Sequence, residues 1–324
     1  MTRRKLTVLV LTMFIATACL AGCGNQKNND KISIVCTVFP EYDWVRNIIG
    51  DNDNIELTLL LDNGADLHNY QPTAADIVTI STCDMFIYVG GESDNWVNAA
   101  LAESQNDKMI VINMMDALGN NAKEEEIVEG MEEEAEEDEE GGEEAPEYDE
   151  HIWLSLKNAE ILVKTISSNI EILDPDNKEA YANNTQLYLT QLEELDNKYQ
   201  TLCENAKTDT LLFGDRFPFR YLVEDYNLNY YAAFVGCSAE SEASFETITF
   251  LAGKVDELGL NSVCTIETSD GKIANTIIEN TAAKNADIVT FDSMQSATLK
   301  EIDNGITYIK IMEDNYNSLD KALN

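Results

Sequence analysis

Residues 176–206, DNKEAYANNTQLYLTQLEELDNKYQTLCENA, carry about thirty residues of helical periodicity without a break. Apolar and aromatic side chains recur along one side of this segment: Tyr181, Tyr188, Leu192, Leu195, Tyr199 and Leu202. At 1.5 Å per residue, such a helix would be on the order of 45 Å long, which is enough to run the height of a two-lobed protein. We therefore interpret it as a strut that joins two halves of the chain.

Both flanks of this helix alternate short apolar runs with helical patterns, as in series of βαβ units. The runs before it are KISIVCTVF (31–39), IELTLLL (55–61), DMFIYVG (84–90) and KMIVIN (108–113). Those after it are TLLFGD (210–215), LNYYAAF (228–234), NSVCTIE (261–267) and ADIVTFD (286–292). The sequence therefore predicts an α/β fold in which lobes 31–174 and 207–324 are joined by a single linker helix, 175–206.

The N-terminus has the pattern of a secretory signal. Arg3, Arg4 and Lys5 precede an apolar run that extends to Leu20 and is too short for a comfortable membrane span. The run closes on Leu-Ala-Gly-Cys, which resembles the lipobox of bacterial lipoproteins, so we expect cleavage after residue 22 and acylation of Cys23. Residues 1–22 would then be a signal peptide and 23–30 a tether that holds the protein outside the cytoplasmic membrane.

The composition restricts the partners. The net charge of −39 excludes a nucleic-acid binder, because phosphate contacts require clustered Lys and Arg, and it favours small cations as ligands. Within residues 124–150, 17 of 27 residues are Asp or Glu, so this block is expected to be a mobile surface loop. It is compatible with a weak cation trap and equally with a solubilising insertion.

The cysteines do not indicate a disulfide framework. Outside the signal and the lipidation position they number five and are widely spaced: Cys36, Cys83, Cys203, Cys237 and Cys264. Cys36 and Cys264 lie in strand-like runs, where a free cysteine serves as a small buried hydrophobe. Only Cys237, in the polar loop GCSAES, is kept as a minor metal candidate.

The chain has only two histidines, and each lies beside acidic residues in a short turn-like motif. His68 is in GADLHNYQPT (64–73) and His151 is in DEHIWL (149–154). This shared context predicts a divalent metal site. Asp66 and Asp149, two residues before each histidine, could orient the imidazoles, but we interpret both as solvated turn residues.

These motifs, together with the FDS of VTFDSMQS (289–296), resemble the metal-binding lipoproteins of bacterial ABC importers. Members of that family receive zinc or manganese outside the cell and hand it to a membrane permease. The resemblance implies a metal site in the cleft between the lobes, with His68, His151 and Asp292 as ligands. Asp292 could instead be a helix N-cap. The family tends to have Pro where Leu67 and Glu150 stand.

The family's third ligand, a His or Glu, has no counterpart, because FGDRFPFRYLVEDY (213–226) places Arg216 at that position. A guanidinium cannot bind a cation. Asp215, Glu240 and Glu267 are the alternatives, and Glu267 could instead orient a ligand. Arg216 is expected to pair with Asp215 or with another nearby carboxylate.

The predicted function is that of an extracytoplasmic, lipid-anchored solute-binding protein that delivers a divalent metal ion to an ABC permease. Two imidazoles and one or two carboxylates suit zinc or manganese, and we favour zinc. We expect no catalytic activity, because the chain has neither HExxH nor GxSxG. We also expect a monomer. The alternatives are a surface adhesin on the same scaffold and, less favoured, a metallohydrolase.

Overall fold

The first four strands form a parallel sheet in the order β2-β1-β3-β4. They are β1 (Ile32–Cys36), β2 (Ile55–Leu59), β3 (Met85–Tyr88) and β4 (Ile110–Asn113). The helices of this lobe are α2 (Phe39–Ile49), α3 (Ala74–Thr82), α4 (Val97–Ala102), α5 (Met114–Leu118) and α6 (Leu156–Leu173). The computed structural model describes residues 31–132, 147–238 and 242–324, and the part from Ile32 to Asn324 forms one compact unit.

The second sheet repeats this plan in the order β6-β5-β7-β8, again with parallel pairing. Its strands are β5 (Thr210–Phe217), β6 (Asn229–Val235), β7 (Ser262–Ile266) and β8 (Asp287–Phe291). Its helices are α8 (Arg220–Asp225), α9 (Phe245–Leu258), α10 (Lys272–Asn280), α11 (Leu299–Asp303) and α12 (Tyr308–Leu323). In each sheet the first strand lies between the second and the third, so a crevice is expected at the carboxyl ends of the strands.

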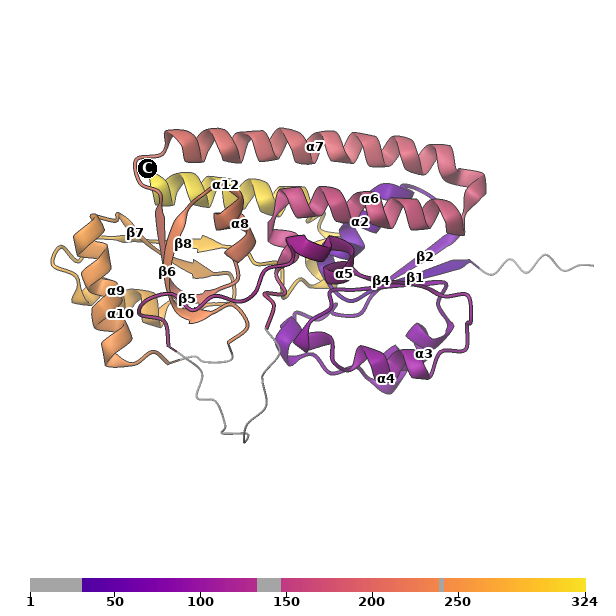
Figure 1. Ribbon diagram of the computed structural model, residues 1–324, viewed down its shortest axis with the longest axis horizontal. Coiled ribbons are helices and arrows are strands. Elements are labelled where there is room, and N and C mark those ends of the chain that lie inside the picture. Colours follow the sequence, from indigo (N-terminus) through magenta and orange to yellow (C-terminus); the bar gives the residue numbers. More distant parts are fainter. Residues whose placement is uncertain (1–30, 133–146, 239–241) are drawn as a thin grey trace, which may run out of the picture. The chain divides into compact units, whose positions relative to one another are not determined.

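Helix α7 (Lys178–Asn205) lies along both lobes, as predicted (Figure 1). All six apolar and aromatic side chains that define its predicted face are buried: Tyr181, Tyr188, Leu192, Leu195, Tyr199 and Leu202. It packs against α6 and α2 of the first lobe and against α12 of the second. No helix within the described ranges is both long enough and apolar enough to cross a membrane.

Helix α12 adds a second connection between the lobes. The backbone N–H of Tyr308, its first residue, donates to Oδ2 of Asp43 on α2 at 2.9 Å. The Tyr308 ring packs edge-on against Trp44 with ring centroids 5.2 Å apart. The hydroxyl of Tyr199 on α7 donates to the carbonyl oxygen of Met312 at 2.6 Å. The lobes are therefore held together by packed helices as well as by the chain connection.

Helix α6 offers a matched test of this packing, because Ile166 is fully buried whereas Ile172 is 72% exposed. We expect Ile166→Ala to lower the free energy of unfolding by about 2–5 kcal/mol, since it removes buried methyl groups and leaves a cavity. Ile172→Ala is expected to change it by no more than about 0.5 kcal/mol. Urea titration of both variants measures the difference, and equal losses would contradict the burial assigned to α6.

Candidate metal site

His68 is positioned by a turn that follows β2. Oδ1 of Asp66 accepts the backbone N–H of His68 at 3.1 Å and so caps the short 3₁₀ helix Leu67–Asn69. Leu67 is buried beneath this turn, which fixes its orientation on the lobe. The imidazole of His68 is consequently held near the surface, with 10% of its side chain exposed.

His151 is fully buried at the start of the 3₁₀ helix Ile152–Leu154. Oδ1 of Asp149 accepts hydrogen bonds from its backbone N–H at 2.8 Å and from its ring Nδ1 at 2.9 Å. Because the carboxylate accepts from Nδ1–H, the lone pair of the ring lies on Nε2. The interpretation of Asp149 as a solvated turn residue is therefore wrong: this side chain is buried and orients the imidazole.

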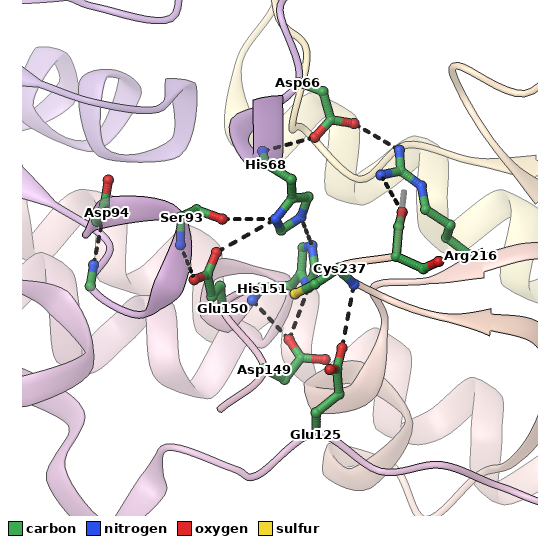
Figure 2. A network of polar contacts seen from close by, with 12 residues as sticks. Asp66, His68, Ser93, Asp94, Glu125, Asp149, Glu150, His151, Arg216 and Cys237 are labelled. Atoms are coloured by element: carbon green, nitrogen blue, oxygen red, sulfur yellow. Dashed lines mark hydrogen bonds and ion pairs between the residues drawn. The ribbon is translucent and has the colours of Figure 1, made fainter. Parts of the chain in front are cut away.

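The two imidazoles meet with their Nε2 atoms 3.2 Å apart (Figure 2). Two nitrogens bound to one tetrahedral zinc at about 2.0–2.1 Å would lie roughly 3.3 Å apart, so the spacing suits a shared ion. Nδ1 of His68 lies 2.8 Å from Oγ of Ser93 and 3.6 Å from Oε2 of Glu150. When this Nδ1–H donates to Ser93, two Nε2 lone pairs face each other, an arrangement that a cation stabilises.

A third donor comes from the second lobe. Within the described residues, His68, His151 and Cys237 form a group whose potential ligand atoms all lie within 4.8 Å of one another. Cys237 follows the end of β6, so its backbone is placed by the strand. From sequence, Cys237 was only a minor metal candidate, and its position directly after an apolar strand was the available signal.

Asp292 and Glu267 follow strands β8 and β7 but are outside that three-residue group. Oδ1 of Asp292 accepts the backbone N–H of Met294 at 2.8 Å, whereas Glu267 accepts the N–H and the hydroxyl of Ser293, each at 2.8 Å. Burial and the nearby Glu267 raise the pKa of Asp292 to about 7. Trp153 Nε1 donates to the carbonyl oxygen of Ser293 at 2.9 Å and thereby ties this turn to the segment that carries His151.

Arg216 lies at a β-bulge, because the register of β5 shifts between Phe213 and Arg216. The bulge directs its guanidinium to Oδ2 of Asp66 at 2.7 Å, and a second bond at 3.3 Å reaches the carbonyl oxygen of Ser238 (Figure 2). This ion pair joins the two lobes. Arg216 thus pairs with a nearby carboxylate as expected, and Asp66, like Asp149, is a structured residue rather than a solvated one.

The carboxylate of Asp215 is only partly hydrogen-bonded, and its assignment as a metal ligand stays a prediction. Oδ1 accepts the backbone N–H of Arg216 at 2.9 Å, and Oδ2 is buried without a hydrogen-bond partner among the described residues. Asp215 also lies outside the three-residue group. A pocket of ≈ 360 Å³ opens beside it between the lobes and is lined by Asp66 and Asn69 on one side and by Asp215 and Arg216 on the other. Glu240 and Cys23 lie outside the described residues.

The electrostatic environment keeps the imidazole of His68 neutral. Burial, followed by the adjacent His151, lowers the pKa of His68 to about 3. A neutral imidazole is the form that binds a metal ion. Glu150, whose pKa is raised by burial, places a carboxyl group beside this ring. Neither Ser93 nor Glu150 was predicted from sequence to contact His68, although Glu150 lies within the DEH motif.

The ends of the acidic block are packed rather than mobile. Glu124 and Tyr148 form an antiparallel bridge, and the N–H of Glu125 donates to the carbonyl oxygen of Glu147 at 2.9 Å. Met131 is buried, and the N–H of Glu132 donates to the carbonyl oxygen of Ala233 on β6 at 3.0 Å. Backbone pairing and Met131 thus anchor both ends of the block, which the sequence did not predict, whereas the mobility expected for 124–150 stays a prediction. Residues 133–146 lie outside the described part.

Comparison with known proteins identifies the family. The model of the periplasmic component A of the zinc-uptake complex, ZnuA, matches residues 34–322. The chain belongs to this family. It is 30% identical over 322 residues to the high-affinity zinc uptake system protein ZnuA of Bacillus subtilis strain 168, and the alignment covers 96% of this chain and 97% of that protein.

A further relative and the solved structure of its ZnuA-like domain agree with the ZnuA assignment. The zinc-binding lipoprotein AdcA of Streptococcus pneumoniae R6 is 30% identical over 313 residues, which are 95% of this chain and 60% of that lipoprotein. The crystal structure of the Zn(II)-bound ZnuA-like domain of S. pneumoniae AdcA has a TM-score of 0.69 at 26% identity, covering 90% of this chain and 99% of that domain. The predicted two-lobed α/β fold and the predicted family of metal-capturing proteins are confirmed.

The five cysteines outside the signal region are all free in the structure, as predicted. Cys36 and Cys264 are fully buried in strands β1 and β7. Burial raises the pKa of the Cys264 thiol to about 12, as expected of an inert core residue. Among these five described cysteines, Cys237 alone belongs to a group of potential metal ligands with the two histidines.

The carboxylate of Asp149 is expected to set the zinc affinity through His151. Asp149→Asn keeps the shape but removes the charge that favours the Nδ1–H tautomer, so we expect a 10–100-fold loss of zinc affinity, the usual effect of losing such an orienting group. Competition with a chromogenic chelator measures it. Asp116→Asn, at the exposed start of α5, is the control, and an unchanged affinity in Asp149→Asn would refute the orienting role.

Buried carboxyl groups predict an unusual pH dependence of the metal-free protein. Burial raises the pKa of Asp94 to about 7 and that of Asp225 to about 6. Because the unfolded values are about 3.9, the folded state binds these protons more tightly, and stability decreases as pH rises from about 4 to 7. Urea unfolding should therefore show a higher midpoint near about pH 5 than near about pH 8. His68, whose pKa is lowered to about 3, acts in the opposite sense, so the test is the comparison of variants. Asp94→Asn should reduce the slope, and an unchanged slope in Asp94→Asn would contradict the prediction.

Proposed function

We propose that this protein captures zinc outside the cytoplasmic membrane and delivers it to an ABC permease. The observation that carries the proposal is the 3.2 Å approach of the two Nε2 atoms, which suits two ligands of one zinc ion. This contact joins the only two histidines of the chain, which are 83 positions apart in sequence. Membership of the ZnuA family supports the same function.

Zinc is favoured over manganese by the donor set. Imidazole suits zinc, whereas carboxylate and water ligands suit manganese. The proposed ligands are His68 and His151 from the first lobe and, from the second, Asp292, whose turn is tied to the His151 segment through Trp153 and Ser293. Asp215, Glu240 and Glu267 have weaker support, and Glu267, which holds Ser293, better fits an orienting role.

Capture without catalysis follows from the same arrangement. Binding by two inward-facing rings and a carboxylate from the opposite lobe would enclose the ion, so the proposed role is that of a carrier and not of an enzyme. Anchoring through acylated Cys23, with a monomeric chain, would keep the cleft close to the membrane. The packed contacts of α7 and α12 support limited movement of the lobes on binding.

Native mass spectrometry combined with equilibrium dialysis tests this function. The purified protein is expected to retain one zinc ion per chain, to lose it to a chelator and to regain it from a zinc buffer. Incubation with manganese at the same free concentration should give weaker occupancy. Absence of any tight ion would favour the adhesin, and hydrolytic turnover that depends on the ion would favour a metalloenzyme; either result would reject the proposal.

A further inference from the structure

The loop after β6 brings the sulfur of Cys237 to the two histidines. Its Sγ, one ring nitrogen of His68 and one ring nitrogen of His151 lie within 4.8 Å of one another. The backbone N–H of Cys237 donates to Oε1 of Glu125 at 3.3 Å, so the packed end of the acidic block holds this loop (Figure 2). The sulfur is therefore part of a donor cluster drawn from both lobes.

Gly236 allows this approach. A Cβ atom at position 236 would lie 3.0 Å from Cε1 and 3.1 Å from Nδ1 of His151, and 3.0 Å from the carbonyl oxygen of Phe217. Such contacts are too close for a side chain between two buried neighbours. Because glycine has no Cβ, the backbone can lie against the imidazole, and the following residue is placed beside the ring.

We propose that Cys237 is a direct zinc ligand and that it replaces the family's third ligand, whose position Arg216 occupies. This inference rests on the proposed zinc-capture function. The sulfur of a tetrahedral zinc thiolate, at about 2.3 Å from the metal, lies roughly 3.6 Å from each bound nitrogen. The observed spacing, at most 4.8 Å, exceeds that value by no more than about 1.2 Å, so a small shift completes a set of two nitrogens and one sulfur.

Binding through sulfur has a defined proton balance. Burial, followed by the carboxylates of Asp149, Glu125 and Glu150, raises the pKa of the Cys237 thiol, so the metal-free protein holds it as S–H. When Zn²⁺ binds, the S–H bond breaks, a Zn–S bond forms and one proton passes to solvent. The same carboxylates favour an incoming cation.

The thiolate would determine which metals the site accepts. Sulfur donors favour zinc and other thiophilic ions and disfavour manganese, which takes oxygen ligands. The ligand would also connect the lobes, because Cys237 belongs to the second lobe and both histidines to the first. Asp292 remains available as a fourth ligand from the end of β8.

Cobalt(II) substitution reads the metal–sulfur bond directly. We expect the cobalt-loaded wild-type protein to show the intense near-ultraviolet charge-transfer band of a cobalt thiolate. Cys237→Ser should lose this band, whereas Cys203→Ser, a change at another free and partly exposed cysteine, should retain it. A cobalt-loaded wild-type protein without the band overturns the inference, and this outcome does not depend on the folding of any variant.

Zinc affinity separates this inference from the proposed function. Cys237→Ser is expected to bind zinc at least ~100-fold more weakly, because losing a direct ligand should cost more than losing an orienting group. If wild type and Cys237→Ser bind zinc equally and His68→Ala does not, the function stands and the sulfur ligand is rejected. If wild type itself binds no zinc, the proposed function fails.

Discussion

His68→Ala is expected to lower the zinc affinity by at least ~100-fold, more than the loss of an orienting group would. His68 provides one of the two Nε2 atoms that lie 3.2 Å apart, and alanine leaves no donor in that position. The ring is already neutral because burial and His151 lower its pKa, so wild-type binding requires no proton loss from it near neutral pH. Chelator competition at constant pH measures the change.

Gln71→Ala is the control for this variant, because Gln71 lies three residues further along the same segment and its side chain is exposed. It should retain the wild-type affinity. The metal-free form of His68→Ala should unfold at about the same urea concentration as wild type or at a higher one, since it removes one of the two facing imidazole nitrogens. Wild-type zinc affinity in His68→Ala would remove the basis of the proposed site.

The fold could be predicted from sequence because its signals are local and repeated. Apolar strand runs and the periodic face of α7 each depend on neighbouring residues, and the buried positions of Tyr181, Leu192 and Tyr199 agree with the pattern. The pairing of α12 with α2 was not predictable in this way. The contact between Asp43 and Tyr308 joins residues 265 positions apart and has no local signature.

The metal site was predictable only in part, because some of its signals are local in sequence and others depend on tertiary contacts. The two histidine motifs are local. The ion-pair partner of Arg216, by contrast, depends on a bulge in β5 that turns its side chain towards Asp66. Burial of Asp149 also depends on tertiary packing, since an Asp two residues before a His is equally compatible with a solvated turn. Predicting that Cys237 lies beside the histidines would have required knowledge of where β6 ends relative to the first lobe.

The network around the rings also has an energetic consequence. A buried polar group without its partner destabilises the folded state. Oε2 of Glu150 and Oδ2 of Asp215 have no hydrogen-bond partner among the described residues. Facing imidazoles and unpaired carboxylate oxygens near the crevice thus leave the metal-free protein with interactions that a cation would improve. Part of the stability of the loaded protein should accordingly come from the ion.

Zinc is therefore expected to raise the unfolding temperature of the wild-type protein. A ligand at 1,000 times its dissociation constant stabilises the folded state by about 4.1 kcal/mol. For a folded unit of this size, that free energy corresponds to a shift of roughly 5–10 °C. Differential scanning calorimetry of chelator-treated protein, with and without buffered free zinc, measures the shift.

The same titration on His68→Ala links this stabilisation to the site. The zinc-dependent shift should fall to near zero in His68→Ala and remain complete in Gln71→Ala, while manganese at an equal free concentration should give a smaller shift in wild type. Any loose binding of ions by the carboxylates of the acidic block should persist in every variant and rise with zinc concentration without saturating. A full, saturable shift in His68→Ala would locate the stabilising ion elsewhere in the protein.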